Sequence, residues 1–235
     1  MKTAIVTGAS RGIGRAITER LMRDGSLVIA TGRDEQSLAS LNTPSIALDL
    51  RDPTSARALI EFALRETGRI DVVVNNAGAT KRGPFLDLSE GDWLDGYSLK
   101  LVGAVRVARA AWPHLKAARG SIVNIAGVGG RTPGAEFSIG GSVNAALLSF
   151  TKSLAEQGVA DGVQVNAINP GAIRTDRLRK RLAAIDEDAF VKSQSITRVG
   201  EPEEVAALVA FLVSSEGRYT HGSLIDIDGG ATKTM

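Results

Sequence analysis

The sequence predicts a single α/β domain built around a doubly wound, parallel sheet of seven strands. Short apolar runs recur seven times along the 235 residues, and segments with the apolar spacing of helices lie between them. The runs are apolar at consecutive positions, as in strands that helices cover on both faces. The length suits one domain, expected over residues 1–235, and we detect no linker or repeat within it.

The predicted elements alternate along the chain. Strands are predicted at residues 4–6, 27–30, 46–48, 72–74, 122–125, 163–168 and 224–227. Helices are predicted around 13–21, 59–63 and 205–212 and over 99–117 and 145–155. Asp52 and Pro53 favour a helix start before 59–63. This alternation predicts right-handed connections and a ligand at the carboxyl ends of the strands.

The turn between the first strand and the first helix is rich in glycine. It reads Thr7-Gly8-Ala9-Ser10-Arg11-Gly12-Ile13-Gly14. Its three glycines let the backbone come close to a phosphate, and the free N–H groups at the helix start face that anion. The turn therefore predicts a bound dinucleotide, and the alternative is a tight turn without a ligand. Three other polar or glycine-rich segments, 75–78, 126–134 and 169–175, are expected at the same edge of the sheet.

Composition argues against several other kinds of site and partner. The net charge of +2 comes from 28 basic and 26 acidic residues without a single basic run, so we expect no nucleic-acid partner. The chain has no cysteine, and its two histidines, His114 and His221, are far apart, so we expect no metal and no disulfide. No stretch of about 18 apolar residues occurs and the chain opens on its first strand, so we expect a cytoplasmic protein without a membrane segment.

Four motifs occur in the order in which one protein family carries them. They are Gly8-x-x-x-Gly12-x-Gly14, Asn75-Asn76-Ala77-Gly78, Pro170-Gly171-x-Ile173-x-Thr175 and Asp228-Gly229-Gly230. Over essentially its whole length the chain resembles the short-chain dehydrogenase/reductases. The resemblance implies a Rossmann-type fold, a nicotinamide dinucleotide, and hydride transfer between the nicotinamide and a carbonyl or alcohol.

The resemblance also implies where the cofactor is contacted. In relatives the two asparagines largely brace the central strands, Ala77-Gly78 passes the adenosine ribose, and the residue at Asp49 contacts the adenine. The full set of implied cofactor residues is Gly8, Ser10, Arg11, Gly12, Ile13, Gly14, Arg33, Asp49, Leu50, Asn75, Ala77, Gly78, Asn144, Pro170, Gly171, Ile173 and Thr175.

The end of the second strand favours NADP(H) over NAD(H). An acid there would bond the ribose 2′-hydroxyl, whereas a base would pair with a 2′-phosphate. The position of that acid holds Gly32, Arg33 follows it, and Arg11 lies where NADP-preferring relatives often have a base. Two guanidiniums that converge on one phosphate make charge-assisted hydrogen bonds. Asp34 is one residue too late for the ribose and is expected to cap the next helix.

The usual catalytic residues of the family are missing from their expected positions. The resemblance implies a proton-donating tyrosine, a lysine four residues later, a serine after the fifth strand and an asparagine on the long helix. Aligned by flanking residues, these four positions hold Gly140, Asn144, Gly127 and Lys100. The chain's two tyrosines, Tyr97 and Tyr219, lie elsewhere, so no small shift restores the motif.

Lys100 and Tyr97 are the candidates for a substitute catalytic group. An ammonium in a partly dry cleft can polarise a carbonyl or donate a proton, with its pKa lowered by desolvation. The alternative for Lys100 is a surface lysine or a structural ion pair. Tyr97 would share a helix face with it, and the alternative there is ordinary packing. Ser138 and Ser142 flank the tyrosine position and are weaker candidates.

Three functions stay open. The leading one is an NADP(H)-dependent oxidoreductase that acts on a small carbonyl or alcohol through an atypical active site. The second is a non-catalytic NADP(H)-binding subunit or redox sensor, in which occupancy by the cofactor alters a partner surface. The third is a structural partner in a hetero-oligomer.

Loop bases at the carboxyl ends of the strands bear on the partner of this protein. If Lys81, Arg82, Arg131, Arg174 and Arg177 converge, they favour an anionic small-molecule substrate or an acyl-carrier partner, and otherwise they are solvated loop charges. Residues 175–196 resemble the family's substrate lid. Relatives assemble through the helices expected at 99–117 and 145–155, which predicts a homotetramer or homodimer.

Overall fold

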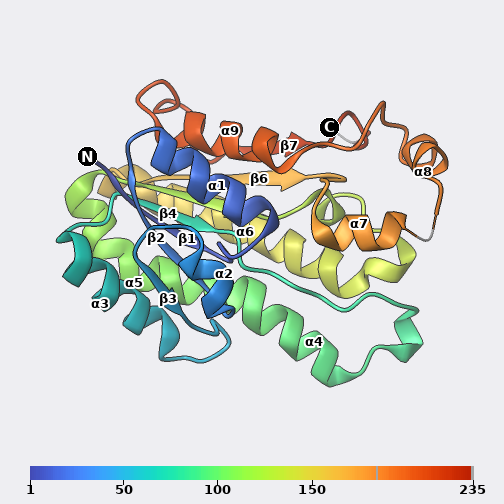
Figure 1. Ribbon diagram of the computed structural model, residues 1–235, viewed down its shortest axis with the longest axis horizontal. Helices are drawn as coiled ribbons and strands as arrows, with labels where there is room; N and C mark the ends of the chain where they lie inside the picture. Colours follow the sequence, from blue (N-terminus) through green and yellow to red (C-terminus); the bar gives the residue numbers. More distant parts are fainter. Residues whose placement is uncertain (184, 234–235) are drawn as a thin grey trace.

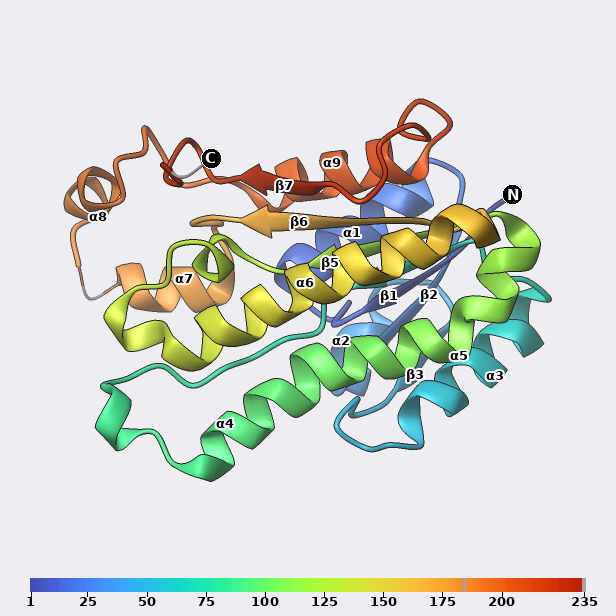
Figure 2. The ribbon, with the colours of Figure 1, turned by 180° about the vertical axis from the view of Figure 1, so that it is seen from behind.

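The computed structural model describes residues 1–183 and 185–233, and in these residues it forms one parallel sheet of seven strands (Figures 1 and 2). The strands run across the sheet in the order β3-β2-β1-β4-β5-β6-β7, each parallel to its neighbour. The order of strands reverses between β1 and β4, which makes their carboxyl ends the expected ligand crevice. The strands are β1 (Thr3–Thr7), β2 (Leu27–Gly32), β3 (Ser45–Ala47), β4 (Val72–Asn75), β5 (Ser121–Ile125), β6 (Gln164–Pro170) and β7 (Leu224–Ile227). The predicted fold class is confirmed.

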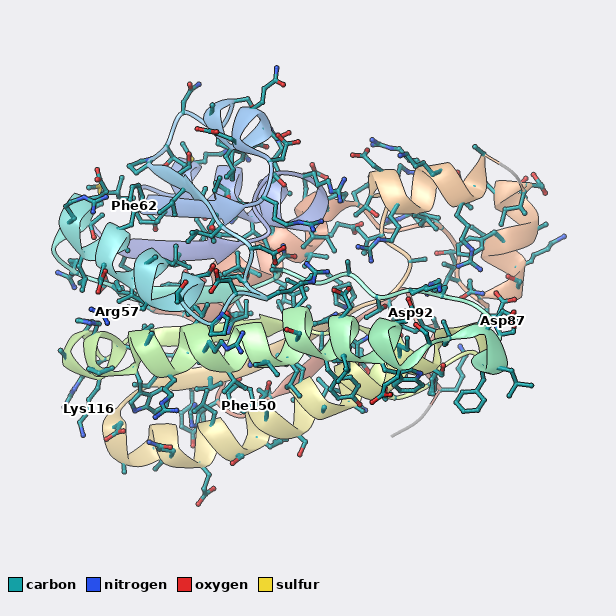
Figure 3. All side chains as sticks on the ribbon, turned by 90° about the horizontal axis from the view of Figure 1, so that it is seen from below. Arg57, Phe62, Asp87, Asp92, Lys116 and Phe150 are labelled. Carbon is teal, nitrogen blue, oxygen red and sulfur yellow. The ribbon has the colours of Figure 1, made fainter. Side chains whose placement is uncertain are left out.

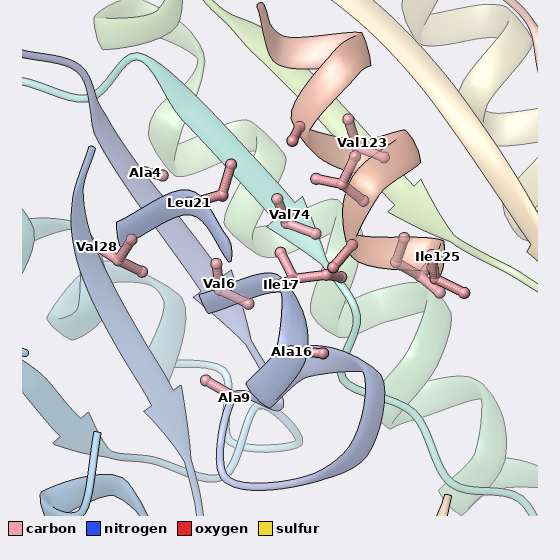
Figure 4. Packing of buried hydrophobic residues seen from close by; sticks show 14 of the residues in the cluster. Ala4, Val6, Ala9, Ala16, Ile17, Leu21, Val28, Val74, Val123 and Ile125 are labelled. Atoms are coloured by element: carbon pink, nitrogen blue, oxygen red, sulfur yellow. The ribbon is translucent and has the colours of Figure 1, made fainter. Parts of the chain in front are cut away.

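Helices cover both faces of this sheet. On one face α1 (Gly12–Arg23) and α9 (Pro202–Val213) pack together over the central strands. Figure 4 shows Ile17 and Leu21 of α1 among the valines of that face, in one buried cluster. On the other face lie α3 (Ser55–Thr67), α5 (Gly103–Ala118) and α6 (Ser138–Asp161) (Figure 2). Since both faces are covered, the inner strands are buried on both sides and mostly apolar, and the polar residues they contain, such as Asn75 and Asn124, are buried as well.

The helix predicted at 99–117 belongs to a longer helical run. It begins with α4 (Glu90–Tyr97), passes through a π-helical segment, Ser98–Val102, and continues as α5. Ser89 starts the run with a capping box, in which its side chain accepts from the Asp92 N–H and the Asp92 carboxylate accepts from the Ser89 N–H. The π-helical segment places an extra residue in one turn, a feature common at functional sites.

The helix predicted at 145–155 is also longer, because α6 starts at Ser138 and ends at Asp161. Gly140 and Gly141 near its start weakened the helical pattern in the sequence. In the structure these glycines admit close neighbours: a Cβ on Gly141 would lie 2.6 Å from the Cβ of Pro133. Figure 3 views α5 and α6 side by side, with Phe150 of α6 between them. Tertiary packing has therefore outweighed the low helix propensity of glycine.

Three short α-helices also occur in the part of the chain that the structure describes. Asp34 caps α2 (Glu35–Ala39) as predicted, since its side chain accepts a hydrogen bond from the Ser37 N–H at 3.0 Å. The segment predicted to be a lid contains α7 (Asp176–Leu182) and α8 (Glu187–Ser193), which project beyond the sheet (Figure 1). Across residues 1–183 and 185–233, none of the helices combines the length and apolar content needed to cross a bilayer.

Candidate functional site

The β1–α1 turn forms a cradle in which the glycines are required by contacts. Gly8 and Gly12 have φ angles of +65° and +54°, which disfavour other residues. A Cβ on Gly14 would lie 2.2 Å from the Gly8 carbonyl oxygen and 2.4 Å from the side-chain nitrogen of Asn76. That nitrogen donates to the carbonyl oxygens of Thr7 and Gly8, at 2.9 and 3.2 Å. The segment after β4 therefore braces the turn directly.

The start of α1 is prepared for an anion. Arg11 occupies the N-cap without making a side-chain cap, and no acidic residue lies in the first turn. The first N–H groups of a helix have no partner within it, and the helix dipole adds positive charge there. Thr175 closes the site from the other side, since its methyl carbon would lie 3.2 Å from a Cβ on Gly12. These residues fit the diphosphate of a dinucleotide.

The far end of the crevice carries the residues predicted to select the cofactor. A Cβ on Gly32 would lie 3.4 Å from the Ser10 hydroxyl oxygen, so the two segments touch. Arg33 is exposed, and its guanidinium is 3.7 Å from the Asp49 carboxylate. Leu50 is buried, so any contact it makes with an adenine would have to come from its backbone.

Asn75 serves mainly to brace the strands. It is buried and donates to the side-chain oxygen of Asn124 at 2.9 Å, and Asn124 donates to the Thr151 hydroxyl at 2.9 Å. This chain of amides ties β4 to β5 and α6. The Asn75 side chain is therefore used to hold the strands together, and a contact with the cofactor would have to form beside these hydrogen bonds.

The segment after β6 lies against the end of β7. Pro170 is buried at the end of β6, and the N–H of Gly171 donates to the Ile227 carbonyl at 3.0 Å. A Cβ on Gly171 would lie 2.7 Å from the Cβ of Asp228, so two of the four motifs meet here. Ile173 is buried, whereas Thr175 reaches the glycine turn. Ile13 also packs inward, against the core under the turn.

A small pocket of about 40 Å³ lies beside the cradle, beyond the end of β4. Its volume suits one or a few water molecules or the reacting end of a small ligand. The lining residues come from the segment after β4, the π-helical segment, the start of α6 and α7, and they are Gly78, Ala79, Thr80, Lys100, Phe137, Gly140, Asn144 and Arg177. Three of the four positions aligned with catalytic residues therefore meet in one pocket.

Lys100 points into this pocket from the π-helical segment. Its ammonium donates to the Ala126 carbonyl oxygen at 2.6 Å. Its stem packs on Gly78, where a Cβ would lie 2.9 Å from the lysine Cδ. Burial, and then the charge of Arg177, lower the pKa of Lys100 to about 7. At neutral pH the amine can therefore both hold and release a proton.

Asn144 lines the same pocket and is in contact with Gly127. Asn144 is buried, and its side-chain oxygen has no hydrogen-bond partner within the described residues. Gly127 has a φ of +151°, and a Cβ there would lie 2.9 Å from the Asn144 side-chain nitrogen. A serine at residue 127 would be strained and would collide with Asn144, so the two residues are matched to each other.

Phe137 fills the space in front of Gly140, which the sequence analysis did not foresee. A Cβ on Gly140 would lie 2.0 Å from the Phe137 ring, and a Cβ on Gly129 would lie 2.6 Å from it. The Arg82 guanidinium lies over the same ring, 3.9 Å from its centroid. The sequence feature that could have indicated this contact is the spacing of three residues between Phe137 and Gly140.

The comparisons with known proteins agree on one family. A family model described as Enoyl-(Acyl carrier protein) reductase matches residues 8–232. The chain is 35% identical to the 3-oxoacyl-(acyl-carrier-protein) reductase FabG of Vibrio harveyi, over 97% of this chain and 96% of that protein. The chain belongs to the short-chain dehydrogenase/reductase family. It is also 31% identical to the meso-2,3-butanediol dehydrogenase of Serratia marcescens, over 98% of this chain and 94% of that one.

Two solved structures superpose over the whole chain. L-sorbose reductase from Gluconobacter frateurii, complexed with NADPH and L-sorbose, has a TM-score of 0.92 at 30% identity, and 97% of it is covered. An NADPH-bound short-chain oxidoreductase from Pseudomonas aeruginosa PAO1, described as containing an atypical catalytic center, has a TM-score of 0.94 at 27% identity, and 98% of it is covered.

Of the five loop bases of this short-chain protein, three are engaged in ion pairs, one lines the pocket and one lies over the Phe137 ring. Arg174 bonds Glu187 and Glu201, each at 2.9 Å. Arg131 pairs with Asp226, and Lys81 with Asp92. Arg177 instead lines the pocket and donates to the Gly78 carbonyl oxygen at 3.2 Å, while Arg82 covers Phe137.

The other polar candidates are placed less favourably. Tyr97 ends α4 and is absent from the described pocket lining. Tyr219 is fully exposed. Ser142 donates to the Ile139 carbonyl, whereas the Ser138 hydroxyl is buried without a partner in the described part of the chain. His221 has a structural role, because it accepts from the Val165 N–H at 3.2 Å.

Proposed function

We propose that this protein is an NADP(H)-dependent short-chain oxidoreductase that transfers hydride to or from a small carbonyl or alcohol through an atypical active site. The cradle would hold the diphosphate, and Arg11 and Arg33 would hold a 2′-phosphate. FabG is a reductase, and the L-sorbose reductase and Pseudomonas structures contain NADPH. Of the remaining implied cofactor residues, Gly78 and Asn144 line the pocket, and Thr175 lies against Gly12 of the cradle, which supports a cofactor that extends from the cradle to the pocket.

We further propose that all four usual catalytic positions are substituted, with Gly127, Gly140, Asn144 and Lys100 in them. The observation that carries the proposal is the position of Lys100: an ammonium with a pKa near 7 lines the pocket that also contains Gly140 and Asn144. The bound nicotinamide supplies the hydride. Lys100 donates a proton to the carbonyl oxygen as the carbonyl carbon is reduced, and the neutral amine then regains a proton from solvent. One of the three N–H groups of the ammonium donates to the Ala126 carbonyl oxygen, which leaves two N–H groups for the substrate.

Substitution of Lys100 tests this role. We expect Lys100→Met to lower kcat for carbonyl reduction by about 10²–10⁴-fold, the range for loss of a general acid. Lys152→Met, which removes an exposed lysine of α6, is the matched control. In the native protein kcat/KM for reduction should be constant below about pH 7 and fall about tenfold per pH unit above it, as Lys100 loses its proton. Equal activity of the two variants on a panel of carbonyl compounds would contradict the role of Lys100.

The choice of cofactor is tested by calorimetry. Loss of a hydrogen-bonded charge pair costs about 1.5–3 kcal/mol, so Arg33→Ala should weaken NADPH binding by roughly 10- to 100-fold and NADH binding much less. Equal affinity of the native protein for both cofactors would exclude the preference for NADP(H).

A second candidate function is a non-catalytic NADP(H)-binding subunit or redox sensor. It is favoured by the Phe137 ring in front of Gly140 and by the small volume of the pocket. NADPH binding without turnover of any carbonyl in the native protein would select this candidate.

We also propose that the substrate is an anionic small molecule, that residues 175–196 act as its lid, and that the protein acts in the cytoplasm as a homotetramer or homodimer. Two long helices, α5 and α6, lie side by side and offer the surface for such an assembly (Figure 3). A monomeric mass by light scattering would exclude it.

A further inference from the structure

The mouth of the pocket carries positive charges that lack acidic partners. Arg82 lies on the Phe137 ring, and Arg177 bonds the Gly78 carbonyl oxygen. Within residues 1–183 and 185–233, neither arginine nor Lys100 forms an ion pair with a carboxylate. Arg174 of the preceding turn, by contrast, holds two glutamates.

These charges lie close enough to affect one another. Burial and then the charges of Arg181 and Arg177 lower the pKa of Arg82, and only the more weakly coupled Glu136 raises it. Burial and then Arg11 lower the pKa of Arg177, which in turn lowers that of Lys100. Both arginines are exposed at the surface, and the repulsion between like charges there is relieved by a bound anion.

Phe137 gives one of these arginines a fixed orientation. Its ring lies beneath the Arg82 guanidinium and is held between the backbones of Gly129 and Gly140. An arginine stacked on a ring keeps its N–H donors free at the edge of the guanidinium, where a carboxylate binds in a planar, two-point fashion. The ring also limits the pocket, so the part of a ligand that enters it must be short.

We propose that Arg82 and Arg177 form a carboxylate-binding subsite at the mouth of the pocket, and that the substrate is a short oxo acid whose carbonyl oxygen meets Lys100. This proposal rests on the proposed function. It assigns the two arginines to the carboxylate and the lysine to the reacting oxygen. It also accounts for the aromatic residue in front of Gly140, which orients Arg82.

Matched substrates test the subsite by activity. Butan-2-one and 2-oxobutanoate share a chain and a carbonyl but differ in one carboxylate, and 3-oxobutanoate places the carboxylate one carbon further away. We expect kcat/KM to be about 10- to 100-fold higher for the better oxo acid than for the ketone, as loss of a charge-assisted hydrogen bond predicts. Arg82→Gln and Arg177→Gln should remove most of this preference through KM. Lys81→Gln, which removes a neighbouring base that is already paired with Asp92, is the control that should retain it.

Binding of oxamate, an unreactive carboxylate, gives a readout that does not need turnover. Calorimetry with the NADPH-loaded protein should show binding that weakens by about tenfold or more in Arg82→Gln. Absence of oxamate binding, or binding undiminished in Arg82→Gln and Arg177→Gln, overturns the subsite even if ketones are reduced. Oxamate binding without reduction of any oxo acid supports the subsite and overturns the reductase function. Absence of NADPH binding overturns the proposed function itself.

Discussion

Gly14 and Gly140 both lie where an added methyl group would collide with a neighbour. The neighbour is a backbone atom at Gly14 and a side chain at Gly140. A Cβ on Gly14 would meet a backbone oxygen of the β1–α1 turn at 2.2 Å. A Cβ on Gly140 would meet the Phe137 ring at 2.0 Å. The first collision cannot be relieved without moving the chain, whereas the second disappears if one side chain becomes smaller.

This difference separates the two halves of the site. The nucleotide cradle is made by the path of the backbone, so its glycines are dictated by geometry and can be read in a sequence. The pocket is made by side chains that fit one another, such as Phe137 with Gly140 and Asn144 with Gly127. Such a set can change together, and a fold can then keep its cofactor while its chemistry changes.

The largest effect is expected from Gly14→Ala. Overpacking a tight contact costs about 1–3 kcal/mol and occasionally more, and this Cβ has two contacts below 2.5 Å. We expect the free energy of unfolding to fall by about 3 kcal/mol and NADPH binding to be lost, because the turn and the helix start must separate. Denaturant unfolding and calorimetry measure the two effects.

Gly134→Ala is the matched control. A Cβ on Gly134 would have no neighbour within 4 Å, and its φ of −79° suits any residue. The free energy of unfolding should stay equal or rise by about 0.4–1 kcal/mol, since alanine restricts the unfolded chain. Similar losses in the free energy of unfolding for Gly14→Ala and Gly134→Ala would mean that the β1–α1 turn is packed no more tightly than an ordinary loop.

A double-mutant cycle at Gly140 and Phe137 gives the next largest effect. Gly140→Ala alone should lower the free energy of unfolding by about 1–3 kcal/mol through its collision with the ring. In a Phe137→Ala background the same change should cost little, so that the coupling reaches about 1 kcal/mol or more. If the effects of the two substitutions are additive, the Phe137 ring is not the reason why a larger residue at position 140 is unfavourable.

The same collision affects attempts to restore the family's usual residues. A chain with Gly127→Ser, Gly140→Tyr and Asn144→Lys still contains Phe137, whose ring occupies the space of the new tyrosine. A gain of activity over the native protein from these three changes alone would show that the ring moves freely. We expect such a gain to require Phe137→Ala as well.

The part of this molecule that the sequence predicted well is the part decided by the backbone. The seven strands, the cap at Asp34 and the glycine turn follow from apolar runs, one short polar side chain and three glycines. Each depends on residues near one another in the chain, and each was found where the pattern indicated.

The pocket was predictable only in part, because its contacts are long-range. The sequence indicated that Lys100 could enter it, and the π-helical segment that delivers this lysine left no visible pattern. Whether a loop arginine meets an acid depends on the fold: Arg174 finds two glutamates, whereas Arg177, three residues later, reaches the pocket. The length of α6 was underestimated because Gly140 and Gly141 are stabilised by packing and not by propensity.

A pH-dependent effect on stability would sharpen the comparison at Lys100. Its pKa is about 7 in the folded protein and 10.5 in the unfolded chain, so between these values the unfolded state binds more protons. The destabilising contribution of Lys100 is therefore complete below about pH 7 and disappears as the pH rises towards 10.5. The urea midpoint of the native protein should rise over this range relative to that of Lys100→Met. Parallel curves would place the ammonium in water and not in the pocket.

The smallest effect on stability is expected at Asn144, where the two halves of the site meet. Its buried side-chain oxygen has no partner within the described residues, so Asn144→Ala removes no hydrogen bond of that oxygen. We expect the free energy of unfolding to change by less than about 1 kcal/mol. If the oxygen instead serves a cofactor, NADPH affinity should fall by about fivefold, the equivalent of one hydrogen bond. Calorimetry and denaturant unfolding on the same variant separate the two quantities. A large loss of stability with unchanged NADPH affinity would make Asn144 a structural residue and would move the boundary of the cradle away from α6.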